Sequence, residues 1–220
     1  MACEQRLRID GRPGGPLMTN SYRLLDRPTG VWALVDPTDD ALDLWRVELA
    51  RTGPPACVLI THGHFDHIGG VAAVRRRYPE LPVWAHPDTA PLLADARLNQ
   101  AAAIGLPCEP AAATHYYREG DRVVIGGSEL RVIDAPGHCV GSVMLHGDGQ
   151  LIAGDVIFQG GVGRWDLPGA DYATLARTIR DKVMTLPDDT RIFPGHGPAT
   201  TVGRERATNP LVREMLARVP

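Results

Sequence analysis

Short apolar runs bounded by glycine, proline or charged residues recur along the chain and alternate with stretches of helical period. Runs at 21–25 and 31–35 predict two strands, which the turn residues between them join as a hairpin. Apolar side chains then recur at helical spacing through 39–51, which predicts a helix. The continuous apolar run at 57–60 is typical of a strand that is buried on both faces. A sheet flanked by helices is therefore expected in this half of the chain.

The rest of the chain continues this alternation. Amphipathic stretches predict further helices at 68–78, 91–99, 171–184 and 211–219. Asp171 is the predicted N-cap of the third of these helices, and Pro210 begins the fourth. Apolar runs predict further strands at 83–85, 122–125, 129–134, 143–145, 151–153 and 191–193. Of these, 122–125 and 129–134 are expected to form one hairpin, and 143–145 and 151–153 a second.

Three stretches depart from this alternation. Residues 1–16 are rich in glycine and proline, and we expect a loosely ordered lead-in that ends in a turn. Residues 100–118 contain alanines and two prolines, and they are predicted to be a loop or broken helix. Residues 154–169 are rich in glycine and lack an apolar period, and a loop of that length is expected to have a function.

Length, charge and cysteine content narrow the class of protein. A chain of 220 residues, 44% of them hydrophobic, is predicted to form one domain over 1–220. The net charge of -3 gives no basic footprint for nucleic acid, and the arginines at 75–77 are expected to be a solvated helix end. No signal peptide and no membrane-spanning run is visible. Because the four cysteines show no paired spacing, we expect a cytoplasmic enzyme without a disulfide framework.

The segment 61–67 concentrates three histidines and a carboxylate directly after the buried strand at 57–60. A mixed set of imidazole and carboxylate ligands suits zinc, iron or manganese. Residues two apart in an extended chain point the same way, so His62 and His64 can face one ion. Asp66 and His67 lie past the bend and can face a second ion. The spacing therefore predicts two metal ions.

Three more candidate ligands follow predicted strands later in the chain. These are His138, Asp155 and His196, and each comes directly after a glycine. A neighbouring glycine allows the backbone to turn tightly and leaves room for an ion. We therefore expect these three side chains to lie near the 61–67 segment.

The chain resembles the metallo-β-lactamase superfamily from about residue 20 to residue 210. The resemblance rests on the ligand motifs, which occur here in the same order as residues 61–67, His138, Asp155 and His196. The resemblance implies a four-layer αβ/βα sandwich with a dinuclear site at one edge. Motifs at 154–158, 163–169 and 193–198 are similar to those of the glyoxalase II (hydroxyacylglutathione hydrolase) group. Because the chain ends soon after His196, it resembles the short, single-domain members, which lack the helical domain that supplies much of the glutathione site.

The resemblance also implies a ligand set and a reaction. It assigns His62, His64 and His138 to one metal ion, and Asp155 to a bridging position. It assigns the second ion to three further residues, which are Asp66, His67 and His196. Two divalent ions are implied, zinc first, with iron or manganese as alternatives. A metal-bound hydroxide, oriented by Asp66, would then attack a thioester such as S-lactoylglutathione.

Substrate-contacting residues follow less directly from the sequence. Arg164 is expected either to reach a substrate carboxylate or to hold its own loop in place. Tyr116 and Tyr117, in the 100–118 segment over the site, are expected either to line the substrate pocket or to pack on the core as a lid. The expected partner is a small thioester, with no nucleic acid or membrane, and the oligomeric state stays open.

Two other functions fit parts of the pattern. A mononuclear iron persulfide dioxygenase acting on glutathione persulfide shares the Gly-Arg-x-Asp loop at 163–166, and it is the main alternative. A binding or sensing protein that retains the site without catalysis is the second, although no ligand is missing from the set. Hydrolysis of β-lactams is disfavoured, because common dinuclear lactamases carry cysteine at the position of Asp155.

Overall fold

The first sheet contains six strands from the first half of the chain. The structure is a computed structural model that describes residues 5–218. The strands lie in chain order across the sheet. They are β1 (Leu7–Gly14), β2 (Thr19–Asp26), β3 (Trp32–Val35), β4 (Val58–Leu59), β5 (Val83–Ala85) and β6 (His115–Tyr116). The first three are antiparallel and β3 to β6 are parallel, so the carboxyl ends of β3, β4 and β5 share one edge.

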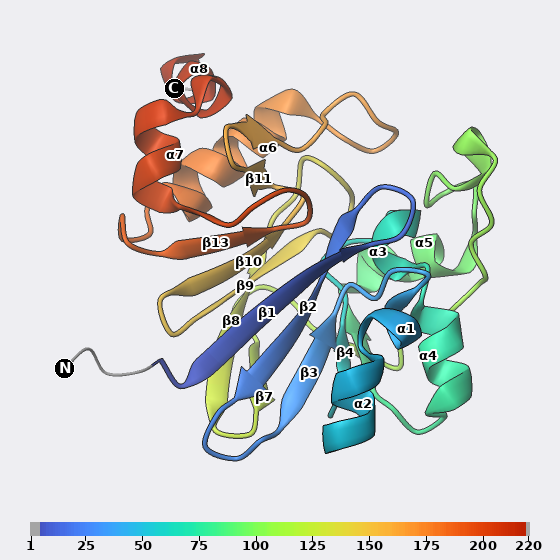
Figure 1. Cartoon of the computed structure of the whole chain (residues 1–220). Coiled ribbons are helices and arrows are strands. Elements are labelled where there is room, and N and C mark those ends of the chain that lie inside the picture. Colours follow the sequence, from blue (N-terminus) through green and yellow to red (C-terminus); the bar gives the residue numbers. More distant parts are fainter. Residues whose placement is uncertain (1–4, 219–220) are drawn as a thin grey trace.

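Short helices cover the outer face of this sheet. They are α1 (Ala41–Leu44), α2 (Arg46–Thr52), α3 (Phe65–Ile68), α4 (Val71–Arg77) and α5 (Ala90–Ala94), with 3₁₀ turns η1 (Pro87–Thr89) and η2 (Ala102–Ile104). Their apolar faces pack on the sheet in one cluster, which includes Trp32, Trp45, Ile60 and Val71. In Figure 1 these helices lie on the right, beside β3 and β4.

The second sheet has the same size and comes from the second half of the chain. Its order is β14-β13-β10-β9-β8-β7. The strands are β7 (Arg122–Ile125), β8 (Ser128–Asp134), β9 (Val143–Gly147), β10 (Gln150–Gly154), β13 (Arg191–Pro194) and β14 (Thr200–Thr201), and a separate hairpin joins β11 (Ile157–Phe158) to β12 (Gly161–Val162). Its outer helices are α6 (Tyr172–Thr178), continued by the π-helical turn η3 (Ile179–Val183), α7 (Val202–Thr208) and α8 (Pro210–Arg218).

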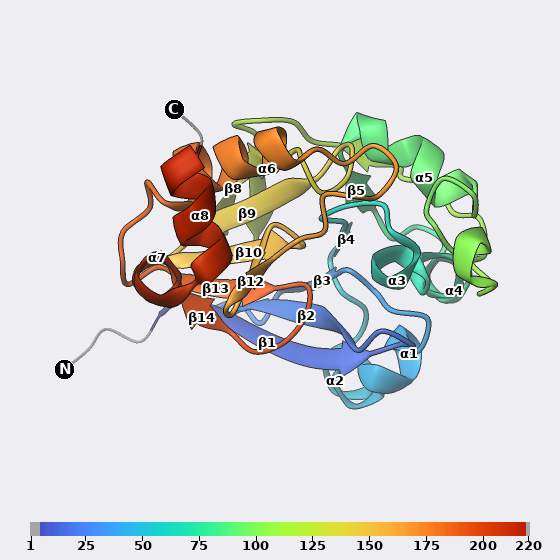
Figure 2. The ribbon, with the colours of Figure 1, turned by 90° about the horizontal axis from the view of Figure 1, so that it is seen from above.

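The two sheets pack face to face. Side chains such as Leu24, Leu59, Leu145 and Ile152 fill the space between them. Another apolar cluster joins the outer face of the second sheet to α6 and α8. Figure 2 shows these two helices on the side of the molecule away from α1 to α5. The order of layers is helices, sheet, sheet, helices. The predicted four-layer αβ/βα sandwich is confirmed.

The prediction of a loosely ordered lead-in over 1–16 is wrong for residues 7–14. These residues form β1, which pairs with β2 along its whole length, from Leu7 opposite Asp26 to Gly14 opposite Thr19. Pro13 is tolerated because β1 is an edge strand, where a missing backbone donor leaves no ladder bond unmade. Residues 1–4 lie outside the described residues.

Several helix boundaries also differ from the predictions. The helix predicted at 39–51 is divided at Trp45, whose indole nitrogen donates to Ser21 Oγ at 3.1 Å. The helix predicted at 91–99 ends at Ala94, because Asp95 Oδ1 accepts from the Arg97 backbone N–H at 2.8 Å and so stabilises a local turn. The predicted cap at Asp171 is confirmed by its 2.8 Å bond from the Thr174 backbone N–H.

The helix predicted at 68–78 is α4, which begins at Val71 and ends at Arg77. The short helices α3 and α7 and the strand β14 were not predicted. Within residues 5–218, none of the helices combines the length and the apolar character needed to cross a bilayer.

Candidate metal centre

The candidate ligands come from the ends of four strands that meet at one edge of the sandwich. His62 and His64 follow β4, and α3 then carries Asp66 and His67. His138 follows β8, and β10 and β13, which are adjacent and parallel, deliver Asp155 and His196. A backbone bond from Gly195 N to Gly154 O, 2.8 Å long, ties the last two turns together. In Figure 1 the red loop that follows β13 lies on the side of the β1–β2 hairpin tip, and Thr19 in that hairpin forms a β-bridge with His196.

Three histidines form the first group. One ligand atom from each of His62, His64 and His138 lies within 4.8 Å of the others. His138 Nε2 and His64 Nδ1 are 3.0 Å apart, and the Nδ1 of His138 donates to the carbonyl oxygen of Arg164 at 2.8 Å. That bond fixes the tautomer that leaves Nε2 of His138 free as a ligand.

The second group combines a carboxylate with two histidines. Asp66, His67 and His196 also meet within 4.8 Å. Asp66 Oδ2 lies 3.4 Å from His67 Nε2 and 3.3 Å from His196 Nε2. All three side chains therefore point toward a common space, which is how the ligands of one ion are arranged.

Asp155 lies between the two groups. Its Oδ2 is 3.4 Å from His196 Nε2 and 3.6 Å from His138 Nε2, and its Oδ1 is 3.4 Å from His67 Nε2. A single carboxylate thus faces members of both groups. This position suits a bridging ligand between two cations.

The groups differ in their electrostatics. In the first group burial disfavours the charged ring, which lowers the pKa of His64 to about 3 and also lowers those of His62 and His138. Burial acts the same way on His196, but Asp155 and Asp66 outweigh it and raise its pKa to about 9. The second group therefore attracts positive charge, which protons or a metal ion can provide.

The residues present fit metal ions. His62 Nε2, His67 Nε2 and Asp155 Oδ1 are buried without a hydrogen-bond partner in the described part of the chain, and such atoms are costly unless a ligand satisfies them. A Cβ at position 195 would lie 2.0 Å from Asp155 Oδ1 and 2.7 Å from a ring carbon of His67, so only glycine keeps this space open. Unpaired ligand atoms around a space kept clear by glycine are the pattern of a metal site.

Asp36 is a site residue that the sequence reasoning missed. It directly follows the strand predicted at 31–35, and its buried carboxylate contacts the 61–67 segment. Asp36 Oδ1 accepts from the Thr61 backbone N–H at 2.8 Å, and Oδ2 accepts from the Thr61 hydroxyl at 2.6 Å. Oδ2 also lies 2.9 Å from His67 Nδ1. Asp36 therefore orients His67 so that Nε2 points toward Asp66 and Asp155. The backbone of Asp36 has a positive φ of 46°, which is unusual for a residue other than glycine, and no sequence pattern reveals this conformation.

The start of β2 holds the other side of the site. The Thr19 hydroxyl donates to Asp66 Oδ2 at 2.6 Å. Asn20 Nδ2 donates to the carbonyl oxygens of Pro194 and Gly197 at 3.0 and 2.8 Å, which fixes the turn that carries His196. The predicted hairpin at 21–35 gave no sign of this role.

A cavity of about 510 Å³ opens over the two groups. Arg164 lines it, but its guanidinium makes two 2.9 Å hydrogen bonds to Asp166, which supports the alternative that it holds its own loop. From the 100–118 segment, Gln100, Ala103 and Ile104 line the cavity.

The prediction that Tyr116 and Tyr117 line the pocket is wrong. Tyr116 belongs to the edge strand β6, outside this cavity. Tyr117 is buried and donates its hydroxyl to Ile60 O at 2.5 Å. The parallel pairing of β6 with β5 places Tyr116 at the edge of the sheet, and the backbone N–H of Tyr117 donates to Ala85 O at 3.2 Å directly after it. Tyr117 therefore follows the alternative interpretation, in which it packs on the core, whereas half of the surface of Tyr116 is exposed.

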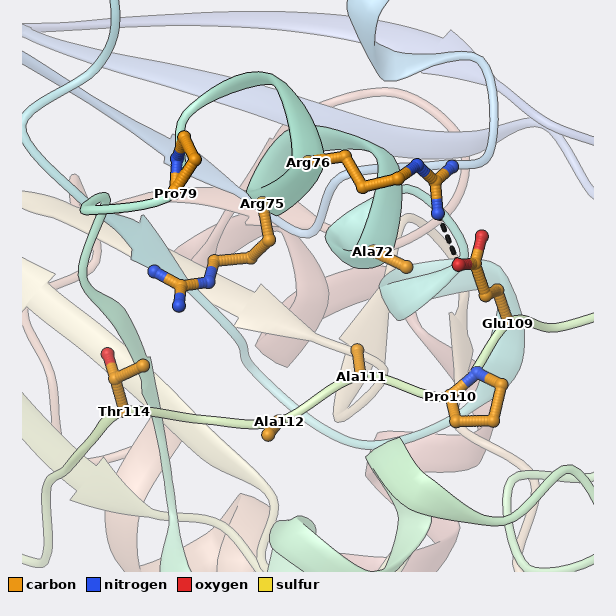
Figure 3. Close-up of a pocket in the computed structure, with 9 residues that line it drawn as sticks. All are labelled: Ala72, Arg75, Arg76, Pro79, Glu109, Pro110, Ala111, Ala112 and Thr114. Atoms are coloured by element: carbon orange, nitrogen blue, oxygen red, sulfur yellow. Dashed lines mark hydrogen bonds and ion pairs between the residues drawn. The ribbon is translucent and has the colours of Figure 1, made fainter.

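A second hollow, beside α4, is not a competing anion site. Figure 3 shows Arg76 reaching across it to Glu109, with which it forms an ion pair. Arg75 Nη1 donates to Leu81 O at 2.8 Å, and the guanidinium of Arg77 lies over the ring of Tyr78. All three arginines thus have partners at the end of α4.

Known proteins were compared with the chain as a whole. A model of the metallo-beta-lactamase superfamily matches residues 14–196. The hydroxyacylglutathione hydrolase GloC of Haemophilus influenzae is 35% identical over 185 residues, which are 82% of this chain and 86% of that protein. The structure of BLEG-1 B3 metallo-beta-lactamase is similar with a TM-score of 0.85 and 36% identity, covering 93% of this chain and 99% of that chain. The structure of TTHA1623 in a di-iron-bound form has a TM-score of 0.79 and 37% identity, covering 91% and 98%.

Proposed function

Since the chain belongs to the metallo-β-lactamase superfamily, we propose that it is a metal-dependent hydrolase that cleaves thioesters in the manner of a hydroxyacylglutathione hydrolase. Water adds to the acyl carbon, the carbon–sulfur bond breaks, and the products are a carboxylate, a thiol and a proton. The similarity to GloC, whose name states this class of reaction, supports the proposal.

The position of Asp155 is the observation that carries the proposal. Its carboxylate faces both His138 and the pair His67 and His196, so two ions would share it. We assign His62, His64 and His138 to one ion, and Asp66, His67 and His196 to the other. When bound, a pair of divalent ions lowers the pKa of water toward neutrality and neutralises charge that develops on a carbonyl oxygen. The di-iron form of TTHA1623 supports a pair, and zinc or manganese also fit these ligands.

The protein itself supplies orientation. Thr19 holds one oxygen of Asp66, Asp36 holds His67, and the carbonyl of Arg164 holds His138. Asp66 is ionised, because His67, His196 and Thr19 outweigh its burial and lower its pKa to about 2. Asp66 can therefore accept a hydrogen bond from the attacking water and orient it toward the acyl carbon. Because a thiolate leaves readily, a strong general acid on the leaving group is not required.

Metal analysis combined with turnover tests this proposal. We expect two ions per chain in the purified protein and hydrolysis of S-lactoylglutathione or of a simple thioester. Hydrolysis should stop after treatment with a chelator and return when metal is restored. A protein with two ions that cleaves no thioester would refute the proposal. One iron per chain together with oxygen uptake on glutathione persulfide would identify the dioxygenase instead.

Hydrolysis of β-lactams is a second candidate, because the structure with a TM-score of 0.85 is named a B3 metallo-beta-lactamase. The same groups that activate water toward a thioester carbonyl can act on a strained amide. The two substrates differ in the leaving group, since an amide nitrogen must be protonated as it leaves. Asp66 and Asp155 are the carboxylates among the described residues that line the cavity, and we assign both to the ions, so neither is a free acid. We therefore expect turnover of a chromogenic β-lactam to be much slower than that of a thioester.

A further inference from the structure

The cavity over the candidate metal centre has two chemically different parts. Its floor consists of five candidate ligands, which are His64, Asp66, His138, Asp155 and His196. Its walls are almost entirely apolar. The apolar side chains come from distant segments, and they are Leu17, Phe65, Ala103, Ile104, Phe158, Val162 and Leu167. A substrate must therefore bring a reactive carbonyl to a polar floor while the rest of it touches hydrocarbon.

The rim of the cavity is apolar and exposed. Leu17, in the turn between β1 and β2, has 48% of its surface exposed, and Ile104, at the end of η2, has 55%. Both line the cavity, although they are 87 residues apart in the sequence. Exposed large apolar side chains that converge on one opening mark a binding surface for an apolar group.

Charged recognition groups are scarce in this cavity. Among the described residues that line it, Arg164 is the one cation apart from the histidines, and both of its forked hydrogen bonds go to Asp166. Gln100 is the one uncharged polar residue. A glutathione conjugate carries two carboxylates and an ammonium group, which need paired partners when they leave water. Apart from Gln100 and the Arg164 side chain that is bonded to Asp166, the described residues of the cavity walls offer no partner for that set of charges.

We propose, on the basis of the thioesterase function above, that this site selects uncharged thioesters that carry an apolar chain, rather than glutathione conjugates. The volume of about 510 Å³ is ample for a chain of several carbon atoms beside the scissile carbonyl. Leu17, Ile104 and Phe158 provide the contact surface for this chain. The substrate gains binding energy from burial of hydrocarbon, and no charge on the thiol is required.

A series of acyl thioesters of N-acetylcysteamine tests this selectivity in the metal-loaded protein. We expect kcat/KM to rise roughly two- to fourfold for each methylene from acetyl to hexanoyl, because each buried methylene contributes about that factor. We also expect hexanoyl-N-acetylcysteamine to be cleaved at least as efficiently as S-hexanoylglutathione, which shares its acyl group. A tenfold preference for the glutathione thioester, or no dependence on chain length, would overturn the inference and leave the thioesterase function intact.

A pair of exposed residues in one segment offers a matched control. Ile104→Ser removes an apolar wall residue, whereas Leu98→Ser changes a leucine that is similarly exposed and lies outside the cavity. We expect Ile104→Ser to lower kcat/KM roughly fivefold for the hexanoyl thioester and by a clearly smaller factor for the acetyl thioester. Leu98→Ser should alter neither. Equal loss on both thioesters in Ile104→Ser would show that this residue does not contact the chain, which contradicts the inference.

Binding of unreactive thioethers gives a readout that does not depend on turnover. Calorimetry compares S-hexyl-N-acetylcysteamine with S-hexylglutathione on the metal-loaded protein. We expect the neutral compound to bind as tightly as the charged one or more tightly, and Ile104→Ser to weaken both. Tighter binding of S-hexylglutathione by tenfold or more would overturn the inference. Absence of any thioester hydrolysis would refute the proposed function alone, and these binding measurements would still decide the selectivity.

Discussion

The two ends of the β-sandwich each bury carboxylates, but they satisfy them in opposite ways. At the end away from the candidate metal centre, Asp26 receives hydrogen bonds from Arg6 at 2.6 and 3.2 Å, from Thr29 Oγ1 at 2.5 Å and from Ser128 Oγ at 2.7 Å. At the other end, Asp155 Oδ1 has no hydrogen-bond partner among the described residues. Histidine nitrogens lie 3.4 to 3.6 Å from the two carboxylate oxygens of Asp155.

This contrast separates a structural carboxylate from a candidate ligand. The partners of Asp26 come from the residue directly before β1, from β8 and from the β2–β3 turn, so Asp26 joins the two sheets and needs nothing further. Asp155 shares its space with several ring nitrogens that repel each other when protonated and attract a cation when neutral. Burial alone does not identify a metal site. A buried carboxylate whose oxygen has no hydrogen-bond partner is a much better sign of a metal site.

Removal of the Asp155 carboxylate should have the largest effect on function. In Asp155→Ala we expect kcat/KM to fall at least 100-fold, because outer partners of metal ligands alone are worth roughly 10- to 100-fold. Metal content, measured by mass spectrometry of the purified protein, should fall below two ions per chain. Circular dichroism should show that the variant is folded. Full metal content and activity in this variant would mean that Asp155 resembles Asp26 after all.

Asp36 should have the next largest effect, since it touches His67 rather than an ion. Asp36→Asn weakens the acceptor for His67 Nδ1 and for the Thr61 hydroxyl. We expect metal affinity to fall roughly 10- to 100-fold, as measured by competition with a chelator. Asp40→Asn is the control, because Asp40 bonds to Thr38 and Gly15 in an exposed loop. An equal loss of affinity in both variants would show a general effect on the loop.

Asp26 should affect stability and leave metal binding unchanged. Arg6 chiefly, with Thr29 and Ser128, outweighs burial and lowers the pKa of Asp26. Because the folded pKa lies below the unfolded value of about 3.9, the ionised carboxylate stabilises the fold above that pH and loses this effect as the pH falls toward the folded pKa. Asp26→Asn should therefore lower the midpoint of thermal unfolding by several degrees at pH 7, and the difference from the original protein should shrink below pH 4.

Two measurements would contradict this view of Asp26. One is a loss of metal ions from Asp26→Asn, which would place it in the metal centre. The other is a difference in unfolding midpoint that stays constant from pH 7 to pH 3, which would show that the charge of Asp26 is not what stabilises the two sheets.

The sequence was most informative about side chains that meet others close to them in the chain. The four candidate ligands of the 61–67 segment come from one strand end and one helical turn, so their spacing alone shows that they can converge. His138, Asp155 and His196 were placed through glycine turns after strands and through family resemblance. The order of strands and helices was also largely predictable from apolar periodicity.

The features that sequence could not predict depend on pairing across the fold. Asp36 meets Thr61 25 positions away, and Asp26 meets Ser128 102 positions away. Neither contact leaves a local pattern. β1 was missed because its glycines and proline suit a turn, and its stability as a strand comes from full pairing with β2. The sequence left open whether Tyr117 faces the pocket or the core, because the pairing of the short strand directly before it decides which way that segment faces.

Substitution of Arg164 should have the smallest effect on kcat/KM. It compares the ion pair of Arg164 with that of Arg6 at the other end of the sandwich. Arg6 pairs with a carboxylate that is fully buried, whereas Asp166, the partner of Arg164, has 62% of its side chain exposed. Exposed pairs contribute little, and Arg164 contacts His138 through its backbone carbonyl, which any residue provides. We therefore expect Arg164→Ala to change kcat/KM less than about threefold on neutral and carboxylated thioesters alike. A loss of tenfold or more on the carboxylated substrate alone would instead show that the guanidinium leaves Asp166 to bind substrate, and the apolar walls would then not be the sole basis of selectivity.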